Sequence, residues 1–216
     1  MKPTVLIVTA HLDDFEFGMG GTTARLCEEG HQVRLIVLCK GDRPGSEHVW
    51  FSRCEANVNN CNDIGIDDVE YHEYSDTRLD QVPQTELCDL ISQPIRDWQP
   101  SIVYTHHRRD VHRDHRIVSD VTRVACRMRS NSPVDELYEF SIPGSTEWSH
   151  ESSQFNVYSD ITDHASDKME MIYRYDTELR EPPDPLSLQM IETRDKYHGS
   201  LCGVDRAETF KLIFKR

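Results

Sequence analysis

Short apolar runs alternate along the chain with longer segments in which apolar residues recur at helical spacing. The runs are rich in Val, Ile and Leu, as strands buried on both faces of a sheet should be. Because strands and helices alternate, we predict an α/β fold with a mostly parallel sheet and helices on both of its faces. The segments predicted as strands are 4–10, 32–39, 68–74, 101–106, 136–142, 155–161 and 208–214.

The segments between these strands carry the helical pattern. Gly30 and Gly65 indicate helix ends, because glycine readily adopts the conformation that closes a helix. Pro94 should kink or split the third helix, since it lacks the backbone N–H that helices use. A polar loop is expected over 40–48. The segments predicted as helices are 20–29, 51–64, 83–99, 114–129, 163–178 and 186–201.

Length and charge limit the classes of protein to consider. The 216 residues are 37% hydrophobic, enough for one sizeable core, so we expect one domain over 1–216. With 24 basic and 38 acidic residues the formal net charge is −14, which argues against nucleic acid or an anionic membrane surface as the main partner. We find neither a membrane-spanning run nor a signal peptide and expect a cytoplasmic protein. A homo-oligomer is possible, and the oligomeric state stays open.

The seven cysteines are scattered along the chain and include no Cys-x-x-Cys pair. Because their number is odd and their spacing irregular, they indicate neither a disulfide framework nor a thiolate zinc site. We interpret most of them as small core residues.

Two clusters of carboxylates and histidines follow the first and fourth predicted strands. The carboxyl ends of parallel strands meet at one edge of a sheet, so we expect the clusters to lie together. Two histidines and a carboxylate are a common catalytic zinc set, and a divalent cation would make crowded carboxylates favourable. The clusters are His11, Asp13, Asp14 and Glu16, and His106, His107, Asp110, His112, Asp114 and His115.

Taken alone, each cluster has an ordinary structural explanation. A histidine after a strand is commonly a hydrogen-bonded structural residue, and adjacent aspartates commonly form a turn or a helix cap. Their combination favours a metal site. Gly18, Gly20 and Gly21 lack the Gly-x-Gly-x-x-Gly spacing of a dinucleotide loop, so we interpret them as allowing a turn and a close helix contact.

The motif AHLDDFEFGMGGT resembles the A-H-P-D-D-E-x-x-x-G-G-T signature of the LmbE-like (PIG-L) N-acetylglucosaminyl deacetylases. HHRRDVHRDHRIV resembles their H-P-x-D-x-H-x-D-H-x-x-V signature, and SRCEA, YSDTRLD and GVDRAETFKLI extend the likeness along the chain. The chain departs from these signatures at Leu12 and Arg108, which replace prolines, and at Phe15, which replaces a glutamate. Whether the adjacent Glu16 takes over that carboxylate is open.

The resemblance implies a single Rossmann-like domain and a zinc ion held by His11, Asp14 and His115. It also implies Asp13 as the general base that takes a proton from the attacking water. The chemistry is consistent with these roles, because zinc lowers the pKa of bound water and a nearby carboxylate can accept the proton.

The same resemblance places His112 beside the tetrahedral oxyanion, which it would stabilise best as a cation. Asp110 or Asp114, both close in sequence, would support the ligands and hold His112 in that state. The alternative is that His112 does not contact the substrate and only helps to orient the ligand His115.

Substrate contacts are implied by the resemblance at Arg53 and Asp76, as partners of sugar hydroxyls; either could instead form a surface ion pair. The polar loop over 141–155 carries Trp148, an aromatic face that can stack on a sugar, so we expect this loop to rim the site unless it is only a connection. No role is assigned to four further aromatic and histidine residues, which are His150, His164, Tyr197 and His198.

The sequence therefore predicts a zinc hydrolase that removes an acetyl group from the amino group of a small-molecule N-acetylated sugar or glycoconjugate. One alternative is a zinc amidase that acts on a non-sugar or thiol-conjugate amide. Another is a catalytically silent sugar- or metal-binding protein, which Asp13 disfavours because a mere binding site does not need a general base.

Overall fold

The computed structural model describes residues 2–41, 47–149 and 155–216. Among these residues the strands are β1 (Thr4–Thr9), β2 (Gln32–Cys39), β3 (Asp68–Tyr74), β4 (Ile102–His106), β5 (Glu136–Phe140), β6 (Val157–Asp160) and β7 (Ala207–Lys215). They form one sheet in the order β3-β2-β1-β4-β5-β7-β6. The strands from β3 to β5 run parallel, and β7 runs antiparallel to both of its neighbours.

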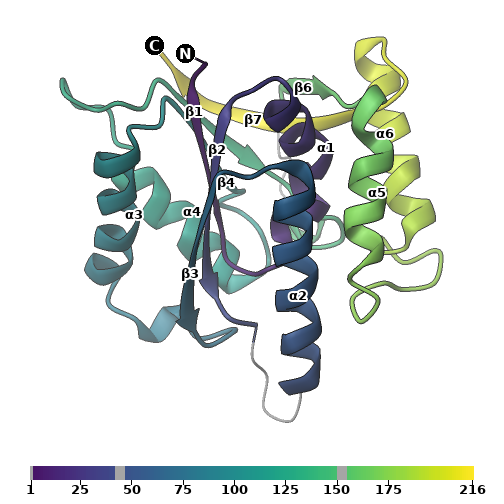
Figure 1. Cartoon of the computed structure of the whole chain (residues 1–216), viewed down its shortest axis with the longest axis horizontal. Coiled ribbons are helices and arrows are strands. Elements are labelled where there is room, and N and C mark those ends of the chain that lie inside the picture. The colour runs from purple at the N-terminus through teal and green to yellow at the C-terminus, as the bar shows by residue number, and fades with distance from the viewer. Residues whose placement is uncertain (1, 42–46, 150–154) are drawn as a thin grey trace.

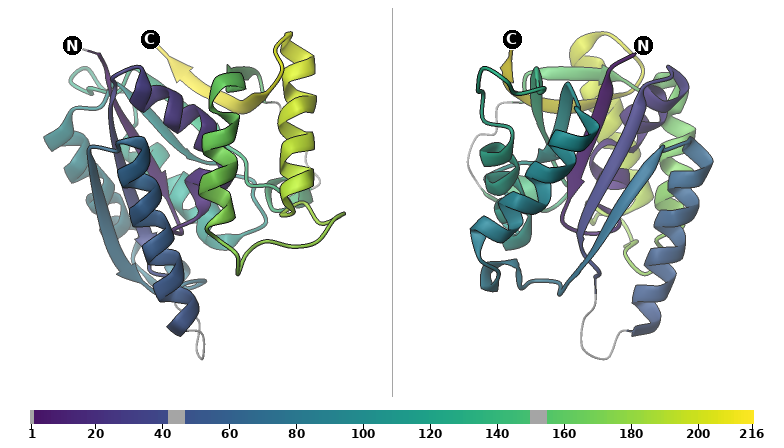
Figure 2. Two further views of the ribbon diagram at one scale, coloured as in Figure 1. Left: turned by 45° about the vertical axis from the view of Figure 1, so that its right-hand side comes forward. Right: turned by 60° about the vertical axis from the view of Figure 1, so that its left-hand side comes forward.

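Helices cover both faces of this sheet, as Figures 1 and 2 show. In the described part of the chain they are α1 (Asp14–Glu28), α2 (Glu47–Ile64), α3 (Gln84–Trp98), α4 (Arg113–Ala125), α5 (Ala165–Tyr173) and α6 (Leu188–Cys202). Helices α3 and α4 pack on one face, and α1, α2 and α5 cover the other. Helix α6 lies against α5, β6 and β7. The predicted α/β architecture is therefore confirmed.

Strand β1 shows how the two cores are built. Successive side chains of a strand point to opposite faces, so Val5 and Ile7 join the core under α1 and α2 while Leu6 and Val8 join the core under α3 and α4. All four side chains are fully buried. This explains why the strand reads as a continuous apolar run rather than an alternating one.

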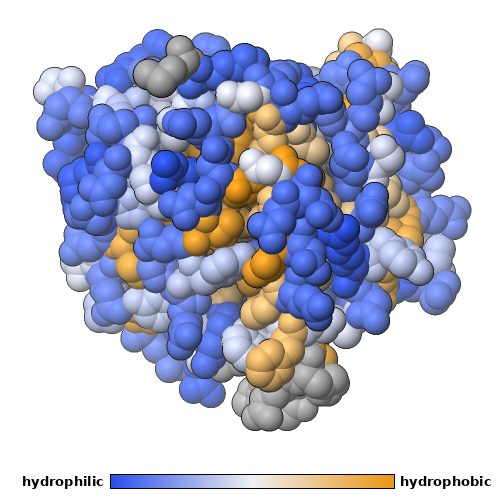
Figure 3. Space-filling model, in the orientation of Figure 1, coloured by the Kyte–Doolittle hydropathy of each residue, from blue (hydrophilic) through white to orange (hydrophobic). Residues whose placement is uncertain are grey.

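The molecular surface is less apolar than these cores. Figure 3 shows a mostly hydrophilic face, with apolar side chains near the middle of the view. Within the described ranges, no helix combines the length and apolar character that a membrane span requires.

The predicted strands are all present, but several helices differ from the prediction. Helix α1 begins at Asp14 rather than at residue 20 and is interrupted at Met19, where φ is −154°. Helix α3 continues through Pro94 and is not split. Helix α5 ends at Tyr173, before the predicted end at residue 178. Of the predicted polar loop over 40–48, residues 42–46 lie outside the described residues.

The glycines of the first motif allow close helix packing. A Cβ atom on Gly18 would lie 2.5 Å from Cδ2 of Phe140, and one on Gly21 would lie 2.9 Å from Cβ of Ile161. Larger residues would push α1 away from β5 and from the segment after β6. The interpretation of these glycines as close-contact residues is confirmed, and Gly18, predicted to precede the helix, lies within it.

The chain reverses its direction across the sheet between β1 and β4. From β1 it proceeds outward through β2 and β3, and it then returns to β4 on the opposite side of β1. In open α/β sheets this reversal leaves a crevice at the carboxyl ends of the two central strands. Both polar clusters of the sequence lie at this point.

Candidate metal and catalytic site

The three predicted zinc ligands converge where β1 and β4 end. Nδ1 of His11 lies 3.2 Å from Nε2 of His115 and 3.4 Å from Oδ2 of Asp14. Nε2 of His115 lies 3.3 Å from Oδ1 of Asp14. Around a tetrahedral zinc ion with bonds of about 2.0–2.2 Å, ligand atoms lie roughly 3.3–3.5 Å apart. The three side chains are therefore close enough together to ligate such an ion, with Oδ2 of Asp14 nearer His11 and Oδ1 nearer His115.

The electrostatics of this cluster are those of a site built for positive charge. Burial opposes ionisation of Asp14, but the rings of His106, His115 and His11 hold its pKa well below the usual value. Burial also lowers the pKa of His115, yet the charge of Asp14 outweighs it and raises the pKa to about 9. A metal bound by His115 would compete with a proton for its ring nitrogen.

In each of the two candidate histidine ligands, the ring nitrogen that faces away from the ligand cluster lies beside a carboxylate. Nε2 of His11 lies 3.1 Å from Oδ1 of Asp76 and 3.5 Å from Oδ2 of Asp114. Nδ1 of His115 lies 3.3 Å from Oδ1 of Asp110. In each ring one nitrogen therefore faces the ligand cluster and the other faces a carboxylate, an arrangement that fixes ring orientation at metal sites.

Asp114 is anchored by backbone groups and Asp110 largely by hydroxyls. Asp114 accepts the backbone N–H groups of Thr77, at 2.7 Å, and of Leu79, at 3.2 Å. Asp110 accepts the hydroxyl of Thr146 at 2.6 Å and the hydroxyl of Ser145. The loops after β3 and β5 thus hold the two carboxylates that orient the histidine rings.

Asp13 lies at the N-terminus of α1 and lines the pocket above the ligands. Its side chain makes no capping hydrogen bond to the helix, so the helix-cap explanation of this aspartate does not apply. Burial and then the charge of Asp14 raise its pKa. A carboxylate with a raised pKa accepts protons more readily, as a general base requires.

His112 lies beside the ligands, but its surroundings differ from the prediction. Its ring centroid is 4.8 Å from that of His11 and 4.5 Å from that of His115. Burial and then the charge of His115 lower its pKa to about 4. Among the described residues no carboxylate forms an ion pair with this ring: Asp110 accepts only the His112 backbone N–H, at 2.7 Å, and Asp114 faces His11. The structure therefore does not support a cationic His112 held by either carboxylate.

The ring nitrogens of His112 also bear on metal binding. One nitrogen each from His11, His112 and His115 can be chosen so that all three lie within 4.8 Å of one another. His112 is thus close enough to approach a metal held by the other two histidines.

A pocket of about 350 Å³ opens above these groups. Arg53 and Asp76, the predicted sugar contacts, both line it. Asp76 also contacts His11, and Arg53 is buried and forms an ion pair with Glu178 at the pocket wall. Arg53 is therefore neither a surface residue nor an unpaired cation.

Parts of the pocket wall were not identified from the sequence. The loop over 141–149 reaches the pocket through Ile142, Gly144 and Trp148, as expected of a rim; residues 150–154, His150 included, lie outside the described residues. Glu178 and residues 184–186 also line it, although they come from a segment after α5 that carries no motif. Only the fold brings that segment to the site.

Glu16 does not replace the carboxylate that the motif loses at Phe15. It is fully buried and, among the described residues, is absent from the pocket lining. Its Oε1 accepts hydrogen bonds from Tyr175 at 2.6 Å and from Asn60 at 2.9 Å, and burial raises its pKa to about 8. Phe15, on α1, packs into the hydrophobic core between this helix and the sheet.

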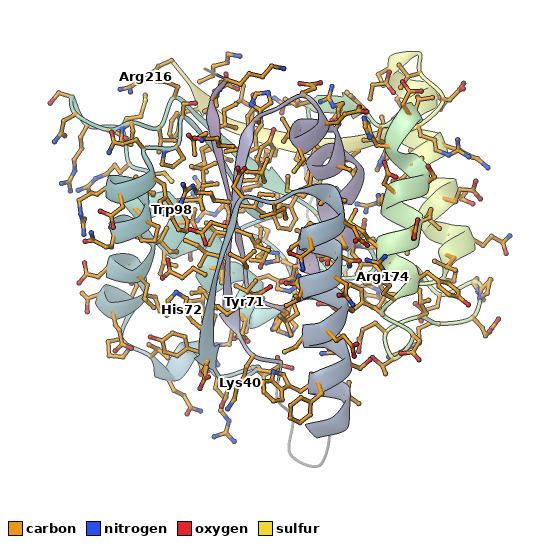
Figure 4. All side chains as sticks on the ribbon, in the orientation of Figure 1. Lys40, Tyr71, His72, Trp98, Arg174 and Arg216 are labelled. Atoms are coloured by element: carbon orange, nitrogen blue, oxygen red, sulfur yellow. The ribbon has the colours of Figure 1, made fainter. Side chains whose placement is uncertain are left out.

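The buried group around Glu16 ties α2 to its neighbours. Figure 4 shows Tyr71 on β3 and Arg174 after α5 on opposite sides of α2. Tyr71 donates its hydroxyl to Asn57 at 2.7 Å, and Arg174 donates to Asn60 at 2.8 Å. Glu16 thus has a structural role in the helix layer.

The remaining unassigned residues lie away from the pocket lining. His164 lies 3.2 Å from carboxylate oxygens of both Glu28 and Asp167. Tyr197 is exposed, and burial together with Arg194 lowers the pKa of His198 to about 4.

Comparison with known proteins connects this site to a family. A sequence profile described as PIG-L: GlcNAc-PI de-N-acetylase matches residues 6–126. The uncharacterized deacetylase YaiS of Escherichia coli (strain K12) is 32% identical over 128 residues, which cover 57% of this chain and 68% of that protein.

Solved structures share the fold at lower identity. The N,N'-diacetylchitobiose deacetylase from Pyrococcus horikoshii is 19% identical, with a TM-score of 0.77 over 98% of this chain and 84% of the other. The conserved protein TT1542 from Thermus thermophilus is 21% identical, with a TM-score of 0.77 over 100% and 96%. GalB, a 4-carboxy-2-hydroxymuconate hydratase from Pseudomonas putida KT2440, is 18% identical, with a TM-score of 0.76 over 100% and 98%.

These structural likenesses establish the fold, and the hydratase shows that one fold carries more than one activity. The family assignment rests on the sequence match, which spans both metal-ligand motifs and more than half of the chain. The chain belongs to the PIG-L family, described as GlcNAc-PI de-N-acetylases.

Proposed function

We propose that this protein is a zinc-dependent hydrolase that removes the N-acetyl group from an amino sugar or an amino-sugar conjugate. One observation carries the proposal: donor atoms of His11, Asp14 and His115 lie 3.2–3.4 Å apart at a pocket that Asp13 also lines. Family membership and the deacetylase description of YaiS support the reaction type. A pocket of about 350 Å³ has room for one acetylated sugar ring.

Asp13 handles the proton in this proposal. A zinc ion held by the three ligands would polarise the amide carbonyl and acidify the attacking water. The Asp13 carboxylate, with its raised pKa, accepts a proton as water adds to the carbonyl carbon. The carbon–nitrogen bond then breaks, and Asp13 returns the proton to the departing amine.

His112 contributes a hydrogen bond rather than a charge. With its pKa lowered to about 4 the ring is neutral near pH 7, so one ring N–H can donate to the carbonyl oxygen as negative charge develops there. Asp76, Asp110 and Asp114 keep the ligand rings in place and take no part in proton transfer.

Acetate release tests the proposal directly. Purified protein is stripped with a chelator, reloaded with zinc, and incubated with N-acetylglucosamine glycosides and, for comparison, with N-acetyl amino acids. We expect acetate from the glycosides, loss of activity on chelation and recovery with zinc. Turnover of the amino acids alone would exclude an amino-sugar substrate. Zinc binding without acetate from any of these compounds would exclude the hydrolase.

A further inference from the structure

Two hydroxyls on the loop after β5 connect the pocket wall to one of the candidate zinc ligands. Thr146 donates its hydroxyl to Oδ2 of Asp110 at 2.6 Å, and Ser145 donates its hydroxyl to Oδ1. Oδ1 of Asp110 in turn lies 3.3 Å from Nδ1 of the candidate ligand His115. Asp110 and Thr146 are buried, so the position of the carboxylate depends on protein groups rather than on solvent.

A second hydrogen bond fixes the orientation of the Thr146 hydroxyl. Oγ1 of Thr146 accepts the backbone N–H of Ile142 at 2.9 Å. A hydroxyl has a single proton to donate, and an ionised carboxylate can only accept. With the Ile142 N–H bound to its oxygen, Thr146 gives its proton to Asp110. The threonine therefore joins the backbone of the loop to the carboxylate.

Asp110 determines which nitrogen of the His115 ring is available to a metal. Because an ionised carboxylate only accepts hydrogen bonds, Nδ1 of His115, which faces it, keeps its proton. Nε2 is then the nitrogen left for a metal, and it lies 3.2 Å from Nδ1 of His11 and 3.3 Å from Oδ1 of Asp14. A carboxylate beside one ring nitrogen in this way prepares the other for metal binding.

The same turn that carries the two hydroxyls also lines the pocket. The carbonyl of Ile142 accepts the backbone N–H groups of Ser145, at 3.2 Å, and Thr146, at 3.1 Å. Ile142, Gly144 and Ser145 line the pocket. The turn therefore faces the pocket on one side and holds Asp110 on the other.

Thr146 holds a part of the carboxylate that nothing else holds. Among the hydrogen bonds of the described residues, Oδ2 of Asp110 has the Thr146 hydroxyl as its one partner. Oδ1 accepts both the Ser145 hydroxyl and the backbone N–H of His112, the latter at 2.7 Å. Without the Thr146 hydroxyl, the carboxylate would be free to rotate away from the His115 ring.

We propose that Thr146 is a positioning residue for the metal. Its hydroxyl, together with that of Ser145, holds the Asp110 carboxylate against Nδ1 of His115 and so keeps Nε2 of that ring ready to bind zinc. The pocket wall and the metal ligand are thereby one mechanical unit. This inference rests on the zinc site of the proposed function and assigns it a residue outside the ligands and the pocket lining.

Thr146→Val, which removes the hydroxyl and nearly keeps the shape, is the test. Competition with a chromophoric chelator should show zinc bound about 3- to 10-fold more weakly, a smaller loss than the roughly 10- to 100-fold typical of removing a ligand's own partner. The loss is smaller because Ser145 and the His112 N–H still hold Asp110. Thr146→Ser, which keeps the hydroxyl, should bind zinc as the wild type does.

The absorption spectrum of the cobalt-loaded protein provides a second readout, because it depends on the geometry of the ligands. The spectrum should change in Thr146→Val and stay unchanged in Thr146→Ser. Neither readout requires turnover.

A matched control separates this role from a loss of stability. Thr122, on α4, is also buried, but its hydroxyl contacts that of Thr105 at 3.3 Å and not a partner of a ligand. Thr122→Val should lower the stability of the zinc-free protein in urea, as Thr146→Val should. Zinc affinity and the cobalt spectrum should nevertheless stay at their wild-type values in Thr122→Val.

A double variant tests whether Thr146 acts through Asp110. Adding Thr146→Val to Asp110→Ala should weaken zinc binding no further, because no carboxylate is left to be held. Additive losses would overturn the proposed path. If Asp110→Ala does not fold, the comparison of Thr146→Val with Thr146→Ser decides.

The outcomes separate the inference from the proposed function. Wild-type zinc affinity in Thr146→Val, or zinc bound as weakly by Thr146→Ser as by Thr146→Val, would overturn the positioning role while leaving deacetylation intact. Wild-type protein that binds zinc but releases no acetate would overturn the proposed function alone. Wild-type protein that binds no zinc would overturn both.

Discussion

Oδ1 of Asp76 lies 3.1 Å from Nε2 of His11, on the ring nitrogen that faces away from the other metal ligands. This contact gives Asp76 a role besides the sugar contact that the resemblance implies. A carboxylate in this position orients the ligand ring and increases its basicity. In the proposed zinc site the aspartate would therefore act on the metal through His11 as well as on the substrate.

Asp76→Asn should weaken zinc binding by about 10- to 100-fold, because the amide cannot provide the same charge to the His11 ring. Competition with a chromophoric chelator measures the zinc affinity. Asp184→Asn, which changes a pocket carboxylate that the structure does not place against a ligand, is the control. If Asp76→Asn changed only KM for the sugar and left zinc affinity at the wild-type value, Asp76 would be a substrate contact alone.

Lys168 is a buried cation on which the packing of α1 depends. Its Nζ lies 2.8 Å from Oδ2 of Asp195 and 3.0 Å from Oε1 of Glu208. Glu208 accepts the backbone N–H groups of Gly21, at 3.1 Å, and Thr22, at 2.8 Å, just beyond the interruption of α1. The lysine thus balances two carboxylates, one of which caps the second part of α1.

Lys168→Met should lower the free energy of unfolding by about 3–5 kcal/mol, because it leaves both carboxylates buried without their cation. Urea denaturation measures this change. Adding Asp195→Asn to Lys168→Met should restore part of the loss, since one of the unpaired charges is removed. A double variant as unstable as the sum of the two single variants would contradict this coupling.

The fold and the convergence of His11, Asp14 and His115 were predictable from the sequence, because each strand and each polar cluster gives a local signal. Val5 to Val8 form an apolar run that is typical of a doubly buried strand, and His11, Asp14 and His115 follow strands whose ends the topology brings together. The helical assignment of Gly18 was missed, since glycine indicates a turn unless a close neighbour such as Phe140 is known.

Other parts of the site depend on contacts that no short motif encodes. Glu178 pairs with Arg53 across more than a hundred residues of sequence, and Pro185 lies against Gly144 although the two are about 40 residues apart. The position of Asp110 at the His112 backbone and of Asp114 at His11 likewise depends on the fold, and sequence proximity to His112 does not reveal it.

His198 should make stability depend on pH. Burial and then the charges of Arg194 and Lys168 lower its pKa to about 4, and Glu208 opposes them only in part. Between about pH 6.5, where an unfolded histidine titrates, and pH 4 the unfolded chain therefore binds one more proton at this residue. The contribution of His198 to the free energy of unfolding is constant above that window and falls as the pH is lowered through it.

His198→Gln should lose less stability than the wild type between pH 7.5 and pH 5, and urea denaturation at both values measures the difference. Ser200→Ala, on the exposed side of the same helix, should follow the wild type. Parallel losses in His198→Gln and the wild type would show that His198 takes up no proton on unfolding.

Asp13→Asn and Asp14→Asn should each lower the activity, but for different reasons. Asp14 lies within 3.4 Å of both histidine ligands, so Asp14→Asn should lose zinc affinity. Asp13 lines the pocket and its side chain makes no capping hydrogen bond to the helix that it precedes, so Asp13→Asn should keep its zinc and its substrate binding. Because an amide cannot accept the proton, its kcat should fall by about 10²- to 10⁴-fold with little change in KM.

Zinc stoichiometry and turnover, measured on the same two preparations, check both expectations. Loss of zinc from Asp13→Asn together with retained zinc and activity in Asp14→Asn would mean that the two roles are exchanged, and full activity in both variants would place the catalytic site elsewhere.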